Sequence, residues 1–285
     1  RDRKPPLTLD LSPLVRGVKG EGVGRGRMDR SVLILGQSPL AEALAELIGA
    51  AGLVVHRPPA WPETREDLDA IFTDQDRREH YLRHLGEAYR EADVVIEAEA
   101  SEWMDPELSE RTLILTAALG HSAAEAAADI HARHRVVGFA ALPPLQKGQA
   151  VELATTPWTE APALDQAGEF FRSVGLEPAV VPDGPGLVFP RILCMIINEA
   201  AFALMEGVAS AEDIDTAMKL GTNYPLGPLE WADQIGLDQV LGVLEGLHQE
   251  YGEDRYRPAP LLRQLVRAGH RGRATGRGFY TYTGT

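Results

Sequence analysis

A short turn near the start of the chain has residue types that could bind phosphate. Residues 36–41 read GQSPLA and stand between the apolar run SVLIL and a helical pattern that begins at Pro39. Backbone N–H groups at such a helix start can bind a pyrophosphate, and glycines let the phosphates come close. The usual G-x-G-x-x-G is replaced here by Gly36, Ser38 and Ala41. The turn keeps one glycine, places a side chain at the second position and has no N–H at Pro39.

The end of the second strand also differs from a usual dinucleotide site. An acidic residue at this place binds the ribose, and by counting it falls on Pro59. Arg57 stands nearby and is of a type that can bind a 2′-phosphate. An arginine followed by two prolines is also typical of a solvated surface. We therefore expect a degenerate nucleotide cradle, with NAD binding left open.

The other chemistry-bearing side chains form no metal motif. The sequence has no H-E-x-x-H and no C-x-x-C arrangement, so we predict no metal site. The single cysteine, Cys194, stands in the apolar helical stretch RILCMIINEA, and we interpret it as a core residue. One cysteine cannot form an internal disulfide, which fits a cytoplasmic protein.

Composition restricts the possible partners. The 285 residues are 44% hydrophobic and 25% charged, which is typical of soluble globular proteins and sufficient for two domains. A net charge of −14 argues against nucleic acid, and the lack of an 18-residue apolar run argues against a membrane span. Residues 1–30 are basic and glycine-rich and predict a flexible extension or linker. Because the chain starts with Arg1, we expect either a fragment of something longer or a chain with an upstream extension.

Two kinds of pattern divide the rest of the chain. Residues 31–184 alternate between helical patterns and the strand runs SVLIL, LVVH, DVVIEA, TLILTA, RVVGFA, AVELA and PAVV. This alternation predicts an α/β domain with a Rossmann-like, mostly parallel sheet. Residues 185–285 have helical periodicity only and predict an all-helical C-terminal domain. Within it, Ser210 and Asp213 form a capping box, and Pro228 begins a further helix.

Several segments resemble one known family. The stretch EDIDTAMKLGTNYPLGPLEWADQIGLD (212–238) resembles the C-terminal signature of NAD-dependent 3-hydroxyacyl-CoA dehydrogenases. DGPGLVFPRIL (183–193) and ATGRGFYTY (274–282) are similar to segments at the start and end of that family's helical domain. By order of elements the resemblance covers residues 31–282. The C-terminal part is most similar to the second copy in the long dehydrogenases of phenylacetate catabolism, which implies a piece of a tandem protein.

The resemblance implies a catalytic group of which little is present here. The family oxidises a hydroxyl with a histidine general base that a glutamate orients, while NAD accepts the hydride. Glu152 matches the glutamate, but the histidine position twelve residues earlier is Ala140. The remaining family positions, a serine and two asparagines, fall on Leu119, Pro143 and Pro190. Only Glu152 survives, so no base is evident.

Two other residues enter the candidate site. Glu97, in DVVIEAEA, matches a glutamate that the family keeps near the nicotinamide, although a structural hydrogen bond would also explain it. His121 lies in a loop after a strand, where sites of parallel sheets collect, and is a candidate substitute base. The alternative is that His121 caps the helix that starts near Ser122.

Three functions follow from these residues. The first is a family member with a degenerate active site that acts as a structural or dimerisation copy, as a homodimer or with a fused or partnered active dehydrogenase. The second is a working NAD(P)-dependent 3-hydroxyacyl-CoA oxidoreductase with a displaced base. The third is an acyl-CoA or nucleotide binder without chemistry.

Overall fold

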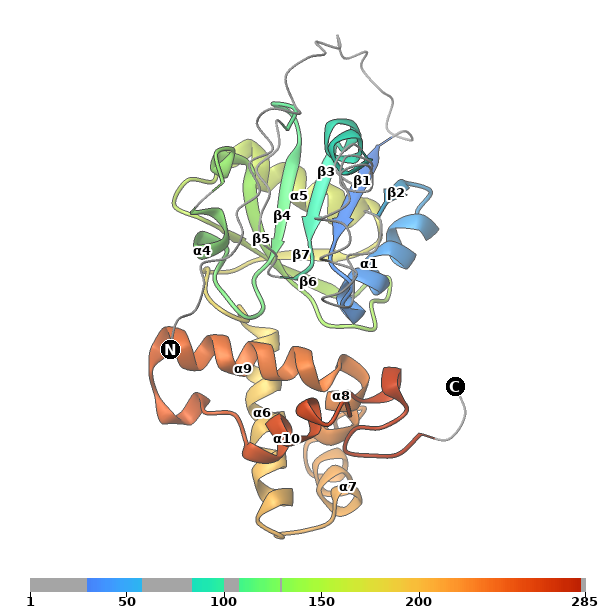
Figure 1. The fold of residues 1–285 in the computed structure, drawn as a ribbon, viewed down its shortest axis with the longest axis vertical. Coiled ribbons are helices and arrows are strands. Elements are labelled where there is room, and N and C mark those ends of the chain that lie inside the picture. Colours follow the sequence, from blue (N-terminus) through green and yellow to red (C-terminus); the bar gives the residue numbers. More distant parts are fainter. Residues whose placement is uncertain (1–29, 58–83, 100–107, 129, 283–285) are drawn as a thin grey trace, which may run out of the picture.

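The chain folds into a seven-stranded sheet domain followed by a helical domain (Figure 1). The computed structural model describes residues 30–57, 84–99, 108–128 and 130–282. The predicted extension over residues 1–30 lies outside the described residues except for Arg30, and Pro59 lies outside them too.

The sheet has the strand order β2-β1-β3-β4-β5-β6-β7, and β5–β6 is its one antiparallel pair. The strands are β1 (Ser31–Leu35), β2 (Val54–His56), β3 (Val94–Glu97), β4 (Leu113–Ala117), β5 (Val136–Ala140), β6 (Ala150–Thr155) and β7 (Glu177–Val180). Each of the seven predicted runs forms one of these strands. The predicted Rossmann-like, mostly parallel sheet is therefore confirmed.

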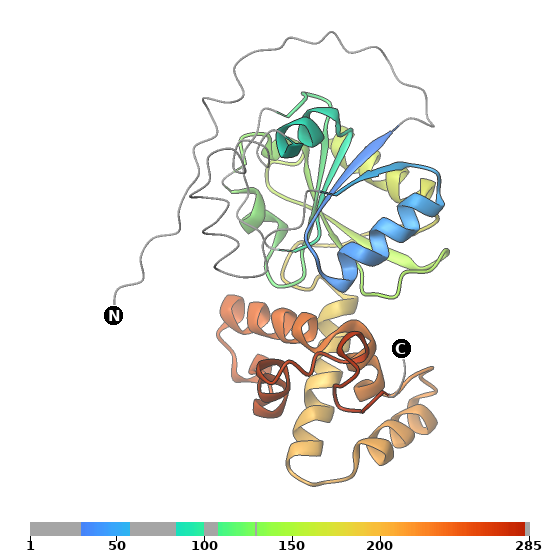
Figure 2. The ribbon, with the colours of Figure 1, turned by 45° about the vertical axis from the view of Figure 1, so that its right-hand side comes forward.

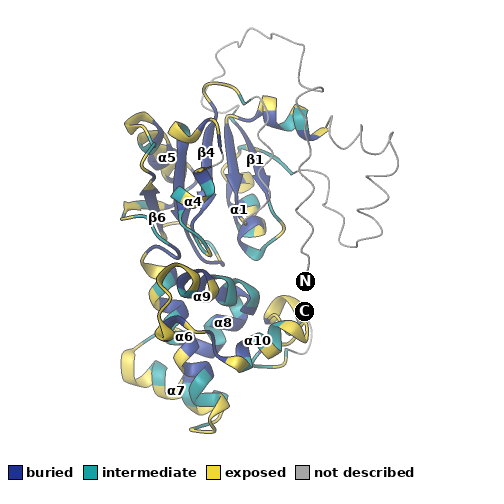
Figure 3. Ribbon diagram, turned by 60° about the vertical axis from the view of Figure 1, so that its left-hand side comes forward, coloured by how far each residue is buried: buried dark blue, intermediate teal, exposed yellow. Residues whose placement is uncertain are grey.

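The central strands are buried on both faces because helices cover both sides of the sheet (Figure 3). In β1, Val32 and Ile34 pack with helices α1 (Pro39–Ala50) and α5 (Ala161–Ser173). The alternate residues Leu33 and Leu35 pack with the helix over residues 84–91 on the opposite face. Continuous apolar runs are therefore needed in these strands.

Helix α4 (Ala123–Ala127) is shorter than the helical pattern predicts. The pattern extends over residues 122–134, but the chain turns after Ala127, and a short 3-10 helix follows at Arg133–Arg135. The turn lets Ile130 join a buried apolar cluster with β4 and β5. Tertiary packing outweighs local helix propensity here.

The helical domain contains α6 (Phe189–Met205), α7 (Ala211–Thr222), α8 (Pro228–Ile235), α9 (Leu237–Tyr251) and α10 (Pro260–Arg267). Ser210 caps α7 by accepting a 3.2 Å hydrogen bond from Asp213 N, as its capping box predicts. Apolar side chains from α6, α8, α9 and α10 form one core. In the described part of the chain, no helix is long and apolar enough to cross a bilayer.

Two buried aspartates connect the helices of this domain to the C-terminal segment. The Asp215 carboxylate accepts from Leu229 N and Glu230 N at 2.9 Å, at the start of α8, and from the Tyr280 hydroxyl at 2.7 Å. The Asp233 carboxylate accepts three bonds from the segment after residue 278. These residues belong to the two segments with the most specific family resemblance, so that resemblance reports a structural network.

Candidate functional site

The candidate site lies where the sheet domain meets the helical domain. Figure 2 shows α1 beginning at the end of the sheet nearest the helical domain, with α9 just below. The carboxyl ends of parallel strands are the place where ligands bind in open α/β sheets. The predicted nucleotide turn and the loop after β4 follow such strand ends. The structure therefore brings most of the candidate residues to this edge.

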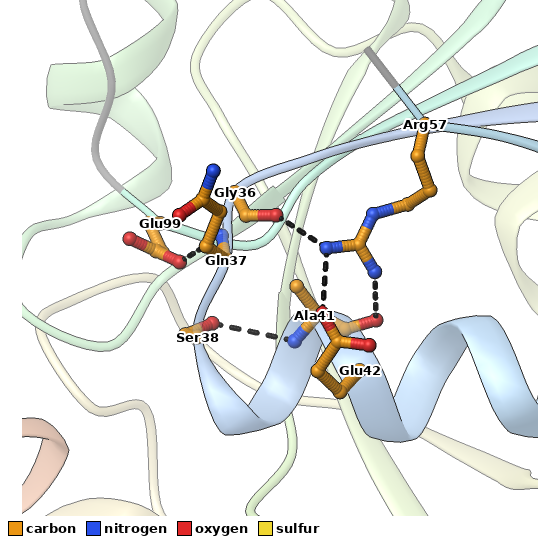
Figure 4. A network of polar contacts seen from close by, with 7 residues as sticks. All are labelled: Gly36, Gln37, Ser38, Ala41, Glu42, Arg57 and Glu99. Carbon is orange, nitrogen blue, oxygen red and sulfur yellow. Dashed lines mark hydrogen bonds and ion pairs between the residues drawn. The ribbon is translucent and has the colours of Figure 1, made fainter. Parts of the chain in front are cut away.

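The nucleotide turn is closed by contacts within the protein (Figure 4). Gly36 has a φ of 111°, a backbone conformation that favours glycine. The next N–H group, of Gln37, donates to a carboxylate oxygen of Glu99. Ser38 caps α1 by accepting a 3.3 Å hydrogen bond from Ala41 N. The residues Gly36, Ser38 and Ala41 thus form a helix start that already has partners.

Arg57 fixes this turn from the end of β2. Its Nη2 atom donates to the carbonyl oxygen of Gly36 at 2.9 Å and to Glu42 Oε1 at 2.8 Å. Arg57 therefore contacts the turn itself, and the expectation of a merely solvated arginine was wrong. The helical domain reaches the same place, since a Cβ added to Gly236 would lie 3.7 Å from Pro39 Cγ.

The position expected for the catalytic histidine lies directly opposite Glu152. In the antiparallel pairing of β5 and β6, Ala140 is the partner of Glu152. Ala140 is buried, 2% exposed, in a cluster with apolar side chains that include Ala118, Ala154 and Leu187. The register places residue 140 directly opposite Glu152, and the alanine side chain there cannot accept a proton.

Glu152 has a structural partner in place of a histidine. Its two carboxylate oxygens accept the N–H groups of Val188 and Phe189, each at 2.9 Å. These groups begin α6, and the N-terminus of a helix favours a negative charge. Glu152 thereby connects the sheet domain to the first helix of the helical domain.

The three other family positions lie among packed residues, and Pro143, at one expected asparagine, is buried. Leu119, at the expected serine, contacts the apolar clusters of both domains. Pro190, at the expected asparagine, is buried in the first turn of α6. Beside Leu119, the backbone of Gly120 touches α9 so closely that a Cβ on Gly246 would overlap the Gly120 carbonyl. The domains are therefore in direct contact beside Leu119.

His121 does not cap α4, contrary to the structural alternative. The Ser122 side chain caps the helix by accepting from Glu125 N at 3.0 Å. Asp183 accepts from the next two N–H groups of the same helix, at 2.8 and 2.9 Å. The Nδ1 atom of His121 lies 3.2 Å from the Ser122 carbonyl oxygen. A role of His121 as a base stays a prediction.

Glu97 and Cys194 are both buried. Glu97 is 3% exposed and accepts a 2.8 Å hydrogen bond from the Thr116 hydroxyl, which is the structural role that the sequence left open. Burial raises the pKa of the Cys194 thiol to about 12, so it is protonated at neutral pH and is not a nucleophile. Cys194 packs in the core of the helical domain, as the apolar stretch predicts.

Sequence reasoning missed Glu99 and Asp183. Both follow the ends of strands, at the same edge of the sheet as the candidate site. Carboxylates at that edge face the N-termini of helices, and this placement is the signal that could have found them.

Known proteins resemble both parts of the chain. The C-terminal domain of 3-hydroxyacyl-CoA dehydrogenases matches residues 186–282. A probable 3-hydroxybutyryl-CoA dehydrogenase of Bacillus subtilis is 39% identical over 89% of this chain and 97% of its own length. With the 3-hydroxybutyryl-CoA dehydrogenase of Bradyrhizobium diazoefficiens, 43% identity covers 53% of this chain and spans about half (51%) of that relative.

Solved structures agree with these relatives. The (S)-3-hydroxybutyryl-CoA dehydrogenase of Ralstonia eutropha superposes with a TM-score of 0.68 and 31% identity, over 90% of this chain and 100% of that one. The 3-hydroxybutyryl-CoA dehydrogenase of Escherichia coli K12 gives a TM-score of 0.64 and 26% identity, and this chain covers 60% of it. Together with the shared fold, these similarities show that the chain belongs to the 3-hydroxyacyl-CoA dehydrogenase family.

Proposed function

We propose that this chain is a non-catalytic member of its family that acts as a structural copy, paired with a second copy of itself or with an active dehydrogenase. The observation that carries this proposal is Ala140, which lies opposite Glu152 in an apolar cluster. The structural copy is favoured over the acyl-CoA or nucleotide binder because Leu119 and Gly120 occupy the contact between the domains.

The missing base decides the chemistry. Oxidation of a 3-hydroxyacyl thioester needs an acceptor for the hydroxyl proton while the hydride leaves the adjacent carbon. A positioned base contributes roughly 10² to 10⁴ in rate, and groups that act as a unit leave little activity once one is removed. The base, the serine and the asparagine are all replaced, and Glu152 bonds to the start of α6. The chain therefore has no route for the proton at this place.

The surface of the helical domain supports the pairing. Large apolar side chains are exposed on α6 and α7, including Ile192 (55% exposed) and Leu220 (83% exposed). A paired copy would cover apolar side chains of this kind at its interface. Some relatives are also longer than this chain, which covers 60% of the solved Escherichia coli protein. A companion copy within one polypeptide is consistent with that difference in length.

An activity assay tests the absence of catalysis. The purified chain is mixed with acetoacetyl-CoA and NADH, and NADH absorbance is followed beside the Bacillus subtilis relative. We expect a rate at least about 10³-fold below that relative, because no general base is in place. A triple variant with Ala140→His, Leu119→Ser and Pro190→Asn should remain inert, since the domains still meet at Gly120.

An ordinary turnover by the purified wild-type chain would overturn the proposal. In that case a His121→Ala variant tests for the substitute base. Loss of turnover in this variant would establish the second function, an oxidoreductase with a displaced base.

Sedimentation in the ultracentrifuge tests the pairing. We expect the chain to form a dimer at micromolar concentration, and Ile192→Glu to shift it toward the monomer because a buried charge is costly at an interface. Val54→Glu is the matched control, since Val54 is comparably exposed (49%) but lies on strand β2 of the other domain. A wild-type chain that stays monomeric both alone and with an active dehydrogenase would contradict the pairing.

A further inference from the structure

We propose that Glu99 is an internal anion that occupies the place of a pyrophosphate, so that this chain excludes the NAD that its family implies. The inference rests on the proposed function, in which the chain transfers no hydride, and extends it to cofactor binding. It concerns cofactor binding, whereas the proposed function concerns the base, so the two can fail separately. The residues that carry it are drawn in Figure 4.

The Glu99 side chain fills the space that Gly36 leaves open. The first glycine of a dinucleotide site allows the tight turn that leads to the pyrophosphate at the helix N-terminus. Here an added Cβ on Gly36 would lie 3.0 Å from Glu99 Oε1 and 3.1 Å from Glu99 Cγ. Even one methyl group would crowd this side chain, and a phosphate group is larger. The cofactor does not fit the turn while Glu99 stays in place.

Two donors of the turn, the N–H groups of Gln37 and Ala41, are also occupied. The first N–H after the glycine, of Gln37, donates to the Glu99 carboxylate. The N–H of Ala41 donates to Ser38 Oγ at 3.3 Å, and Pro39 has no N–H. A phosphate would have to compete for groups that already have partners inside the protein.

Charge acts in the same direction. The N-terminus of a helix carries a partial positive charge that normally attracts phosphate. At the start of α1 two carboxylates, Glu42 and Glu99, lie beside this charge, and the one cation seen in the network, Arg57, is bonded to Glu42 and to the Gly36 carbonyl. A pyrophosphate would meet like charge at close range.

The turn consequently has its hydrogen bonds without a cofactor. A cradle that depends on NAD would leave these backbone groups to solvent or to the ligand. Here Glu99 and Ser38 supply acceptors from the chain itself for the N–H groups of Gln37 and Ala41. Glu99, which closes the site in this proposal, also preserves the local fold.

Nucleotide titration of Glu99 variants tests the inference. NADH fluorescence and calorimetry with ADP are measured on the wild-type chain, Glu99→Ala, Glu99→Gln and Glu46→Gln. Glu46 is the matched control, because it is an exposed carboxylate on the same helix and the same charge is removed. We expect no saturation of the wild-type chain below about 1 mM, and binding to Glu99→Ala that is roughly 10- to 100-fold tighter.

The variants separate charge from contact. Glu99→Gln keeps the side-chain size and removes only the charge, so we expect a smaller gain than for alanine. Equal affinity of Glu99→Ala and the control for NADH and ADP would overturn the inference, as would wild-type binding in the micromolar range. If the wild-type chain binds NADH but does not reduce acetoacetyl-CoA, this inference fails and the proposed function stands. Circular dichroism confirms that each variant is folded.

Discussion

Replacing Asp233 by alanine is expected to lower the free energy of unfolding by about 3–5 kcal/mol. Asp233 is 1% exposed, and its carboxylate accepts from Phe279 N at 2.8 Å, from Tyr280 N at 2.9 Å and from the Tyr282 hydroxyl at 2.9 Å. Burial and the neighbouring Asp233 raise the pKa of Tyr282 to about 12, so this hydroxyl remains a donor at neutral pH. Alanine would leave three donors without their acceptor.

Urea unfolding followed by circular dichroism measures this effect. Asp233→Asn keeps the shape and one acceptor oxygen, so its loss should be intermediate. The control is Asp238→Ala in the same family signature, where the partly exposed carboxylate lies 3.8 Å from Arg271 and a change below about 1 kcal/mol is expected. If Asp233→Ala were as stable as the control, the signature would not be a structural network.

The carboxylates that survive in this chain have one property in common. Glu152, Asp183, Asp215 and Asp233 each accept hydrogen bonds from backbone N–H groups of a segment distant in sequence. Such acceptors are needed whether or not the protein catalyses a reaction, because a buried N–H without a partner is costly. Ala140, at the expected histidine position, lies in an apolar cluster instead. Under the proposed function, this difference explains how the family resemblance persists without the family's chemistry.

The fold was predictable because its signal is local. Apolar runs such as SVLIL, bounded by turns and alternating with helical patterns, indicate buried parallel strands without any knowledge of tertiary contacts. The length of α4 was not predictable in the same way, because the helix stops where Ile130 enters a cluster formed by β4 and β5. Only the packed structure determines that contact.

The candidate site also has one part that the sequence predicted and one part that it did not. Counting from Glu152 to Ala140 found the pair that the antiparallel register places opposite each other, since spacing along a hairpin-like connection fixes the pairing. The partner of Glu99 could not be counted, because Gln37 lies 62 residues away on another strand end. A side chain that closes a site from a different strand leaves no spacing pattern in the sequence.

The contact between the domains can be tested with two glycines of α9. Gly246→Ala is expected to lower the free energy of unfolding by about 3 kcal/mol, because the new Cβ would overlap the backbone carbonyl of Gly120 and the domains would have to separate. Gly242, one turn earlier on the same helix, has no atom within 4 Å of an added Cβ. Gly242→Ala should therefore stabilise the helix by up to about 1 kcal/mol.

The two substitutions are expected to change the free energy of unfolding in opposite directions. Helix propensity favours alanine at both positions, so it cannot explain this difference. Urea unfolding gives the free energies, and hydrogen exchange at Gly120 and its neighbours reports whether the loop after β4 has become exposed. Stabilisation by both substitutions would show that α9 does not press on this loop, and the site would then be open to a substrate. A loss confined to Gly246→Ala would locate the closed contact beside Leu119, where the resemblance expects a serine, since Gly120 directly follows it.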